Sequence, residues 1–142
     1  MLSAARRPLA SLRDPHYHRA MHRLWIALGA LAGLGAVGLS AWAAHGAPAM
    51  LQPAPLEALR SGITMQGWHA LALLATGLFA ERRGGLLPHL AGAAFAIGTL
   101  LFCAGVYSGA LAGLHLGPVA PIGGVTLMAG WALLGLAALK RA

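Results

Sequence analysis

The stretch "LWIALGALAGLGAVGLSAWAAH" (residues 24–45) contains no Asp, Glu, Lys or Arg. A helix of about 20 mostly apolar residues is long enough to cross the hydrocarbon core of a bilayer. Strands of a membrane barrel would alternate polar and apolar residues, whereas this stretch is continuously apolar and rich in Ala, Leu and Gly. The stretch therefore predicts a helix that spans a membrane.

Three further apolar runs follow, at about residues 63–80, 86–113 and 119–139, and none has a charged residue in its interior. The chain of 142 residues is 9% charged, compared with about 25% in a soluble domain. We therefore predict an all-α membrane protein: a basic N-terminal arm at 1–23 and a bundle of four transmembrane helices at 24–142. The segment "PLEALR" (residues 55–60) is either a short helix or a loop.

One feature of the first run is also compatible with a targeting segment. It ends in "AWAAHG" (residues 41–46), which is similar to a signal-peptide cleavage site. The apolar stretch before that site is about 17 residues, which is long for a signal peptide core. We therefore expect the first run to remain as a transmembrane helix.

The basic residues predict the orientation of the bundle. If four helices alternate in direction, nine of the ten Lys and Arg residues fall on one side, and only Arg60 falls on the other. Cytoplasmic loops of membrane proteins carry an excess of Lys and Arg. We therefore expect both termini in the cytoplasm of a bacterium, with the protein in the inner membrane. The alternative is the matrix side of the mitochondrial inner membrane.

The same charge pattern also indicates which kinds of partner to expect. Nucleic-acid-binding proteins gather basic residues on a soluble surface, whereas here the basic residues flank apolar runs. We expect the lipid bilayer and other membrane protein subunits as partners, and no nucleic acid. The single cysteine, Cys103, excludes an internal disulfide.

Small residues four positions apart predict how the helices pack. Inside lipid, helices associate where small side chains let their backbones approach. We expect two such faces, one in the first run and one in the third, formed by Gly29 and Gly33 and by Gly105, Gly109 and Gly113. Tryptophans near the ends of membrane helices act as interface anchors, which is the role expected of Trp25, Trp42 and Trp68, while Trp131 is expected to pack.

Polar residues inside the runs are the candidate functional residues. Counted from Ile63 at 1.5 Å per residue, His69 is expected about 9 Å below the outer membrane surface, and Gln66 lies on nearly the same helix face. With these two residues, His45 and Tyr107 are expected to form a structural cluster in the outer half of the bundle. Two histidines on facing helices can also ligate haem iron or another metal, so His45 and His69 are weak candidates for cofactor binding. His22, among arginines of the arm, is expected to face solvent or headgroups.

Several segments together resemble a known family. They are "GLSAWAAHG" (38–46), "WHALALLATGL" (68–78), "GTLLFCAGVYSGALAG" (98–113) and "APIGGVTLMAGWALLGLAAL" (120–139). In this order they resemble domain of unknown function family 423, which includes the transmembrane protein 256-like proteins. The resemblance covers about residues 29–139 and implies a four-helix inner-membrane protein, but no reaction. Trp68 stands where that family usually has tyrosine.

Three functions remain open from the sequence. The first is a structural or accessory subunit of a larger membrane complex. The second is a carrier or channel for a small or lipid-like molecule, and the third is a haem-binding or metal-binding electron-transfer protein. A proton pathway would need a carboxylate within the membrane, and the four runs contain none. We predict no catalytic residue, no metal site and no cofactor, and we do not expect an enzyme.

Overall fold

The computed structural model describes residues 15–140, with side chains from residue 21 onward. It contains four long helices, α2 (Pro15–His45), α3 (Pro53–Arg83), α4 (Leu86–Ala112) and α5 (Val119–Leu139), and a short 3-10 turn, η1 (Ala47–Ala49). Each long helix has the length and apolar composition to cross a membrane, and residues 15–140 form no strand. The predicted all-α fold with four transmembrane helices is confirmed.

The observed helix boundaries differ most from the predicted ones at the start of α2 and at the start of α3. α5 has the predicted bounds, and α4 ends one residue earlier than expected. α3 begins at Pro53 rather than Ile63, so "PLEALR" is part of the transmembrane helix. Prolines at the start of α3 are tolerated because the first N–H groups of a helix have no partner within it. α2 begins at Pro15, inside the predicted arm.

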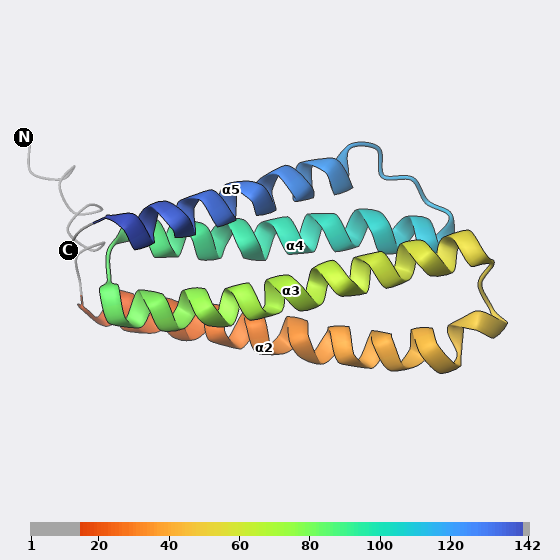
Figure 1. Ribbon diagram of the computed structural model, residues 1–142, viewed down its shortest axis with the longest axis horizontal. Coiled ribbons are helices and arrows are strands. Elements are labelled where there is room, and N and C mark those ends of the chain that lie inside the picture. The colour runs from red at the N-terminus through yellow and green to blue at the C-terminus, as the bar shows by residue number, and fades with distance from the viewer. Residues whose placement is uncertain (1–14, 141–142) are drawn as a thin grey trace, which may run out of the picture.

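The helices form two antiparallel hairpins joined side by side. α2 packs along α3, α4 packs along α5, and the α3–α4 contact joins the two hairpins, while α2 touches α4 much less. The start of α2 and the end of α5 lie at the same end of the bundle (Figure 1). We call this the basic end, and the opposite end, which carries η1 and the α4–α5 loop, the loop end.

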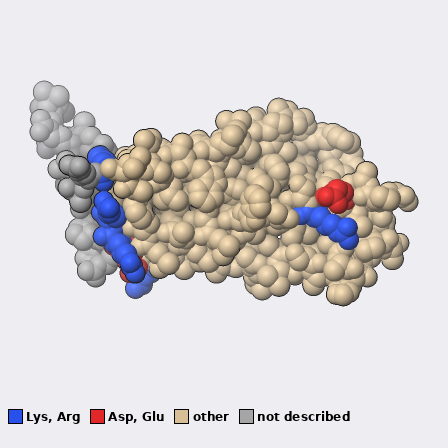
Figure 2. Space-filling view, in the orientation of Figure 1, with Lys and Arg blue, Asp and Glu red and all other residues tan. Residues whose placement is uncertain are grey.

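Among the residues whose side chains the structure describes, the charged ones lie only toward the two ends of the bundle. Figure 2 shows Lys and Arg gathered at the basic end, and a smaller group beside an acidic residue toward the loop end. The basic end carries Arg23, the pair Arg82 and Arg83 at the end of α3, and Lys140 after α5. The long middle of the surface is uncharged, as a lipid-facing surface must be.

The buried side chains form two clusters along the bundle. Near the loop end, the first cluster draws on α2, η1, α3 and α4, and is centred on Leu59 and Ile63. Toward the basic end, Trp25, Leu73, Phe95 and Leu127 bring all four helices together. α5 therefore joins the core mainly in the basic half of the bundle.

Trp25 is not the interface anchor that the sequence predicts, because only 4% of its surface is exposed. Its ring N–H donates a 3.0 Å hydrogen bond to Nδ1 of His89. Gly92 leaves space for the ring, since a Cβ atom there would lie 2.6 Å from it. With its one polar atom satisfied inside, Trp25 packs as a core residue. Trp68, in contrast, is 63% exposed.

The predicted packing glycines have different environments. A Cβ atom on Gly29 would lie 2.8 Å from the carbonyl oxygen of Ala70, and one on Gly105 would lie 2.8 Å from the backbone nitrogen of Ala120. These two glycines therefore permit close approach of α2 to α3 and of α4 to α5.

The other three predicted glycines are not at close helix contacts. Cβ atoms on Gly33 and Gly109 would meet neighbours only at ordinary distances of 3.8 and 3.9 Å. Gly113 is the C-cap of α4, with a φ of 67° and no neighbour within 4 Å. It takes part in no helix packing, because a left-handed residue ends the helix there.

Candidate functional site

The polar residues of the predicted cluster lie in three separate places. Gln66 and Tyr107 bond to each other, His69 lies in a different contact, and His45 is exposed at the end of α2. The structure therefore does not bring His45 together with the other three. Since α3 starts at the loop end, His69 lies about 24 Å along the bundle from that end at 1.5 Å per residue.

Gln66 connects three helices through its side-chain amide. Its nitrogen donates to the carbonyl oxygen of Ala32 in α2 at 2.8 Å, and its oxygen accepts from the hydroxyl of Tyr107 in α4 at 2.7 Å. Two glycines make room: a Cβ atom on Gly35 would lie 2.8 Å from the amide nitrogen, and one on Gly62 would lie 2.5 Å from the Tyr107 ring. This arrangement fixes the relative positions of α2, α3 and α4.

His69 occupies the middle of α3 rather than its outer part. It lies 16 residues after Pro53 and 14 before Arg83, so it is close to the centre of the helix. The predicted depth of about 9 Å was counted from Ile63, whereas α3 extends ten residues beyond Ile63 toward the loop end. Only 3% of the side chain is exposed.

Both ring nitrogens of His69 are hydrogen-bonded. Nε2 is 3.2 Å from the indole nitrogen of Trp131, which can only donate. Nδ1 is 2.7 Å from the carbonyl oxygen of Met65, so it carries the proton. The ring also packs against Phe95, with centroids 5.9 Å apart, and against Trp131 at 6.1 Å. Binding of a metal by His69 would therefore require breaking one of these hydrogen bonds.

Residues 21–140 contain no group of three or more His, Cys, Asp or Glu side chains placed to hold a metal ion. His45 and His69 are too far apart along the bundle to ligate one ion or one haem together. The geometry instead makes His69 a bridge from α3 to α5, through Trp131.

Two histidines are buried toward the basic end, of which sequence reasoning missed His89 and misplaced His22. His89, near the start of α4, accepts the hydrogen bond from Trp25. His22, which the sequence places among solvated arginines, is 8% exposed, and its Nε2 is 3.7 Å from the carboxylate of Glu81. The expectation for His22 is wrong because α2 starts at Pro15, so His22 lies within the helix, beside Gly77 near the end of α3. The sequence did carry a signal for His89, because a histidine inside an apolar run indicates a side chain with a buried partner.

A groove of about 540 Å³ opens between α2 and α4. α2 and α4 meet at Trp25 and His89 but pack on each other much less than on α3. Leu, Ile and Ala side chains form most of the groove lining, and Gln66, Thr99 and Cys103 supply its polar atoms. With a largely apolar lining in the lipid-facing middle of the bundle, the groove suits a hydrocarbon chain or the side chains of another helix.

Comparison with known proteins identifies relatives across most of the chain. The chain is 31% identical over 119 residues to the UPF0382 inner membrane protein YgdD of Escherichia coli, covering 83% of this chain and 91% of the relative. It is 35% identical over 121 residues to the UPF0382 membrane protein SERP0230 of Staphylococcus epidermidis, covering 84% and 98%. It is 31% identical over 120 residues to the UPF0382 membrane protein YwdK of Bacillus subtilis, covering 83% and 98%.

No solved structure matches the chain. The bacterial relatives and the four long apolar helices confirm the predicted location in the bacterial inner membrane. The family model described as "Protein of unknown function (DUF423)" matches residues 39–124. This chain therefore belongs to the DUF423 family, whose relatives named above are the UPF0382 membrane proteins.

Proposed function

We propose that this protein is a structural subunit that associates laterally with other membrane proteins through the outer faces of α2 and α5. The interior supports this role, because Gln66, His69 and Tyr107 bond to other parts of the bundle. Any contact with a partner must then be made by side chains on the outer surface of the bundle. The groove between α2 and α4 adds an apolar recess that side chains of a neighbouring helix would fill.

The observation that carries the proposal is the placement of two glycines. Gly38 in α2 and Gly135 in α5 are exposed, and a Cβ atom on either would have no neighbour within 4 Å. Glycine in a helix is less stable than alanine by about 1 kcal/mol, and no contact within the chain compensates for it here. Small residues in membrane helices permit close approach of another helix, so these faces suit a transmembrane helix of a partner.

The first test replaces each outward glycine by leucine. We expect the tagged wild-type protein, extracted in mild detergent, to run on native mass spectrometry with bound partner subunits. The Gly38→Leu and Gly135→Leu variants should appear mainly as the single chain. Because these positions have no intrachain neighbour and leucine is a better helix former than glycine, both variants should keep the wild-type free energy of unfolding or raise it by up to about 1 kcal/mol.

An exposed alanine supplies the matched control for this test. Ala104 faces outward from α4, so Ala104→Leu adds similar apolar bulk to a surface outside the proposed interface. It should leave the assembly intact. A wild-type protein that occurs only as a single chain, or equal dissociation of the Ala104→Leu variant, would refute the proposal.

We further propose that the basic end faces the cytoplasm, supported by the excess of Lys and Arg there. A variant with Cys103→Ser has no other thiol, so a single new cysteine reports its own side of the membrane. We expect Gln52→Cys, at the loop end, to react with a membrane-impermeant maleimide in cells whose inner membrane is intact. Arg82→Cys should react only after that membrane is opened. The reverse pattern would show the opposite orientation.

A further inference from the structure

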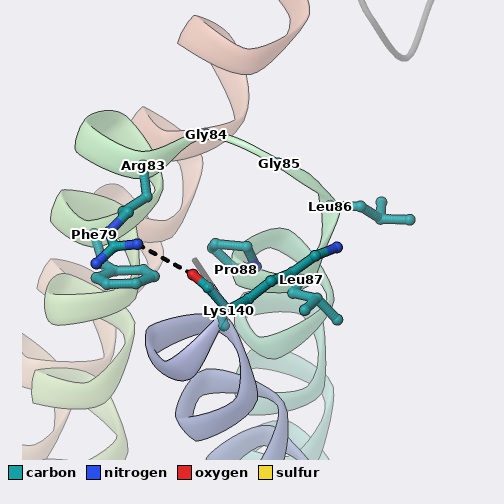
Figure 3. A pocket seen from close by; sticks show the side chains of 9 residues that line it. Phe79, Arg83, Gly84, Gly85, Leu86, Leu87, Pro88 and Lys140 are labelled. Carbon is teal, nitrogen blue, oxygen red and sulfur yellow. Dashed lines mark hydrogen bonds between the residues drawn. The ribbon is translucent and has the colours of Figure 1, made fainter. Parts of the chain in front are cut away.

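A pocket of about 200 Å³ lies at the basic end, where three helix ends meet. It is enclosed by the last turns of α3, the first turn of α4 and the end of α5. Figure 3 shows the Arg83 side chain beside the Phe79 ring on the α3 side. The Lys140 side chain extends past Leu87 on the α5 side, with Pro88 between the two cations. The pocket therefore combines an apolar floor with two cationic side chains at its edge.

The Arg83 side chain is held in place by two contacts, but the positive charges of the pocket are not neutralised. The Arg83 guanidinium lies 5.9 Å from the centre of the Phe79 ring and donates one hydrogen bond, of 3.2 Å, to the carbonyl oxygen of Lys140. A guanidinium has five N–H donors, so others remain for a ligand. In the described part of the chain, neither Arg83 nor Lys140 is paired with a carboxylate. The neighbouring acidic residue, Glu81, lies 3.7 Å from His22 instead.

The backbone beside the cations adds to the positive potential. Gly84 and Gly85, with φ of 64° and 84°, join α3 to α4 and carry no side chain over the pocket. Gly85 is the N-cap of α4 and supplies no side-chain hydrogen bond to the first turn. The first N–H groups of a helix lack intrahelical partners, and that end carries a partial positive charge. Leu86 and Leu87, in this first turn, line the pocket.

We infer that this pocket binds the phosphate group of an anionic membrane phospholipid. Phosphate oxygens suit a guanidinium, an ammonium and a helix N-terminus together. Basic pockets between transmembrane helices recognise anionic lipid headgroups in this way. The apolar floor of Phe79, Leu87 and Pro88, at the end of membrane-spanning helices, fits a lipid rather than free phosphate. This site is independent of the proposed protein partners and of the side that the basic end faces.

The test measures lipid binding to the full chain in mild detergent by native mass spectrometry. The probes are phosphatidylglycerol, phosphatidylcholine and inorganic phosphate, at an ionic strength where the Debye length is about 8 Å. Both lipids carry the phosphate group, but the trimethylammonium group of phosphatidylcholine is repelled by the two cations of the pocket. We therefore expect phosphatidylglycerol to bind about tenfold more tightly than phosphatidylcholine. Millimolar inorganic phosphate should not displace the bound lipid. Equal binding of the two lipids would overturn the inference, and displacement by inorganic phosphate would show that the ligand is a free anion.

Variants that each remove one positive charge distinguish binding of the lipid at this pocket from a general attraction of the lipid to the basic end. Lys140 has no side-chain contact that holds the fold, so Lys140→Gln should keep the melting temperature and bind phosphatidylglycerol about tenfold more weakly. The matched control is Arg82→Gln, which removes the same charge from an exposed neighbour of Arg83 that does not line the pocket. Arg82→Gln should weaken binding by less than about twofold, because Arg82 does not line the pocket and would act on the lipid only through a longer-range attraction that salt screens. Equal weakening by the two variants would show that the lipid binds without a site.

Discussion

Replacement of Gly123 by alanine is expected to prevent normal packing of α5 on α4. A Cβ atom at Gly123 would overlap the backbone nitrogen of Phe102, and it would lie 2.8 Å from the Cα of Phe102 and 2.9 Å from the carbonyl oxygen of Gly98. These are backbone atoms, so the helices must separate to relieve the overlap. Overpacking of a core by added methyl groups typically destabilises by about 1–3 kcal/mol. We expect the upper end of this range or more, measured as the unfolding free energy in detergent.

The neighbouring residue provides the control. At Gly124 an added Cβ would be 4.0 Å from the Phe102 ring, which is an ordinary contact. Gly124→Ala should therefore be neutral or stabilising, because alanine is the better helix former. On the facing helix, Gly105→Leu should destabilise the same interface, since its Cβ would lie 2.8 Å from the backbone of Ala120. If Gly123→Ala and Gly124→Ala unfold alike, α4 and α5 do not approach as closely as described.

The sequence predicted the fold well because a bilayer imposes strong requirements on composition. Four charge-free runs predicted four helices, and the bounds of α5 were correct because Pro118 precedes it and Lys140 follows it. The start of α3 was not predictable in this way. Glu57 and Arg60 interrupt the apolar pattern, yet the helix continues through them to Pro53. Transmembrane helices often extend beyond the hydrocarbon core, and hydropathy does not report where such a helix ends.

The candidate site was less predictable, because spacing along one helix does not identify the partner helix. Gln66 and His69 were expected in one cluster on nearly the same face of α3. Their side chains diverge instead: Gln66 reaches α2 and α4, while His69 reaches Trp131 in α5. The predicted glycine faces were also only partly correct, because spacing does not show which glycine meets another helix. Gly105 lies close to Ala120, whereas Gly109 has no close neighbour.

Removal of the His69 side chain is expected to be the most damaging change among the polar residues. His69→Ala leaves the indole N–H of Trp131 without its acceptor and removes the ring that packs on Phe95. Truncation of large buried side chains to alanine destabilises by about 2–5 kcal/mol, and an unsatisfied polar group adds about 1–3 kcal/mol. Trp131 is half exposed, which reduces the second contribution. We therefore expect a loss of about 3 kcal/mol, seen as a lower melting temperature in detergent.

His45→Ala is the control for this prediction, because His45 is exposed at the end of α2 and should leave stability unchanged. A double-mutant cycle with Trp131→Phe isolates the hydrogen bond, and a coupling free energy of about 1 kcal/mol is expected for a contact of this kind. The metal content of the purified protein should be the same in His69→Ala and the wild type, because both ring nitrogens already have partners. Unchanged melting together with loss of a bound metal would instead make His69 a ligand, and the structural role of its hydrogen bonds would be wrong.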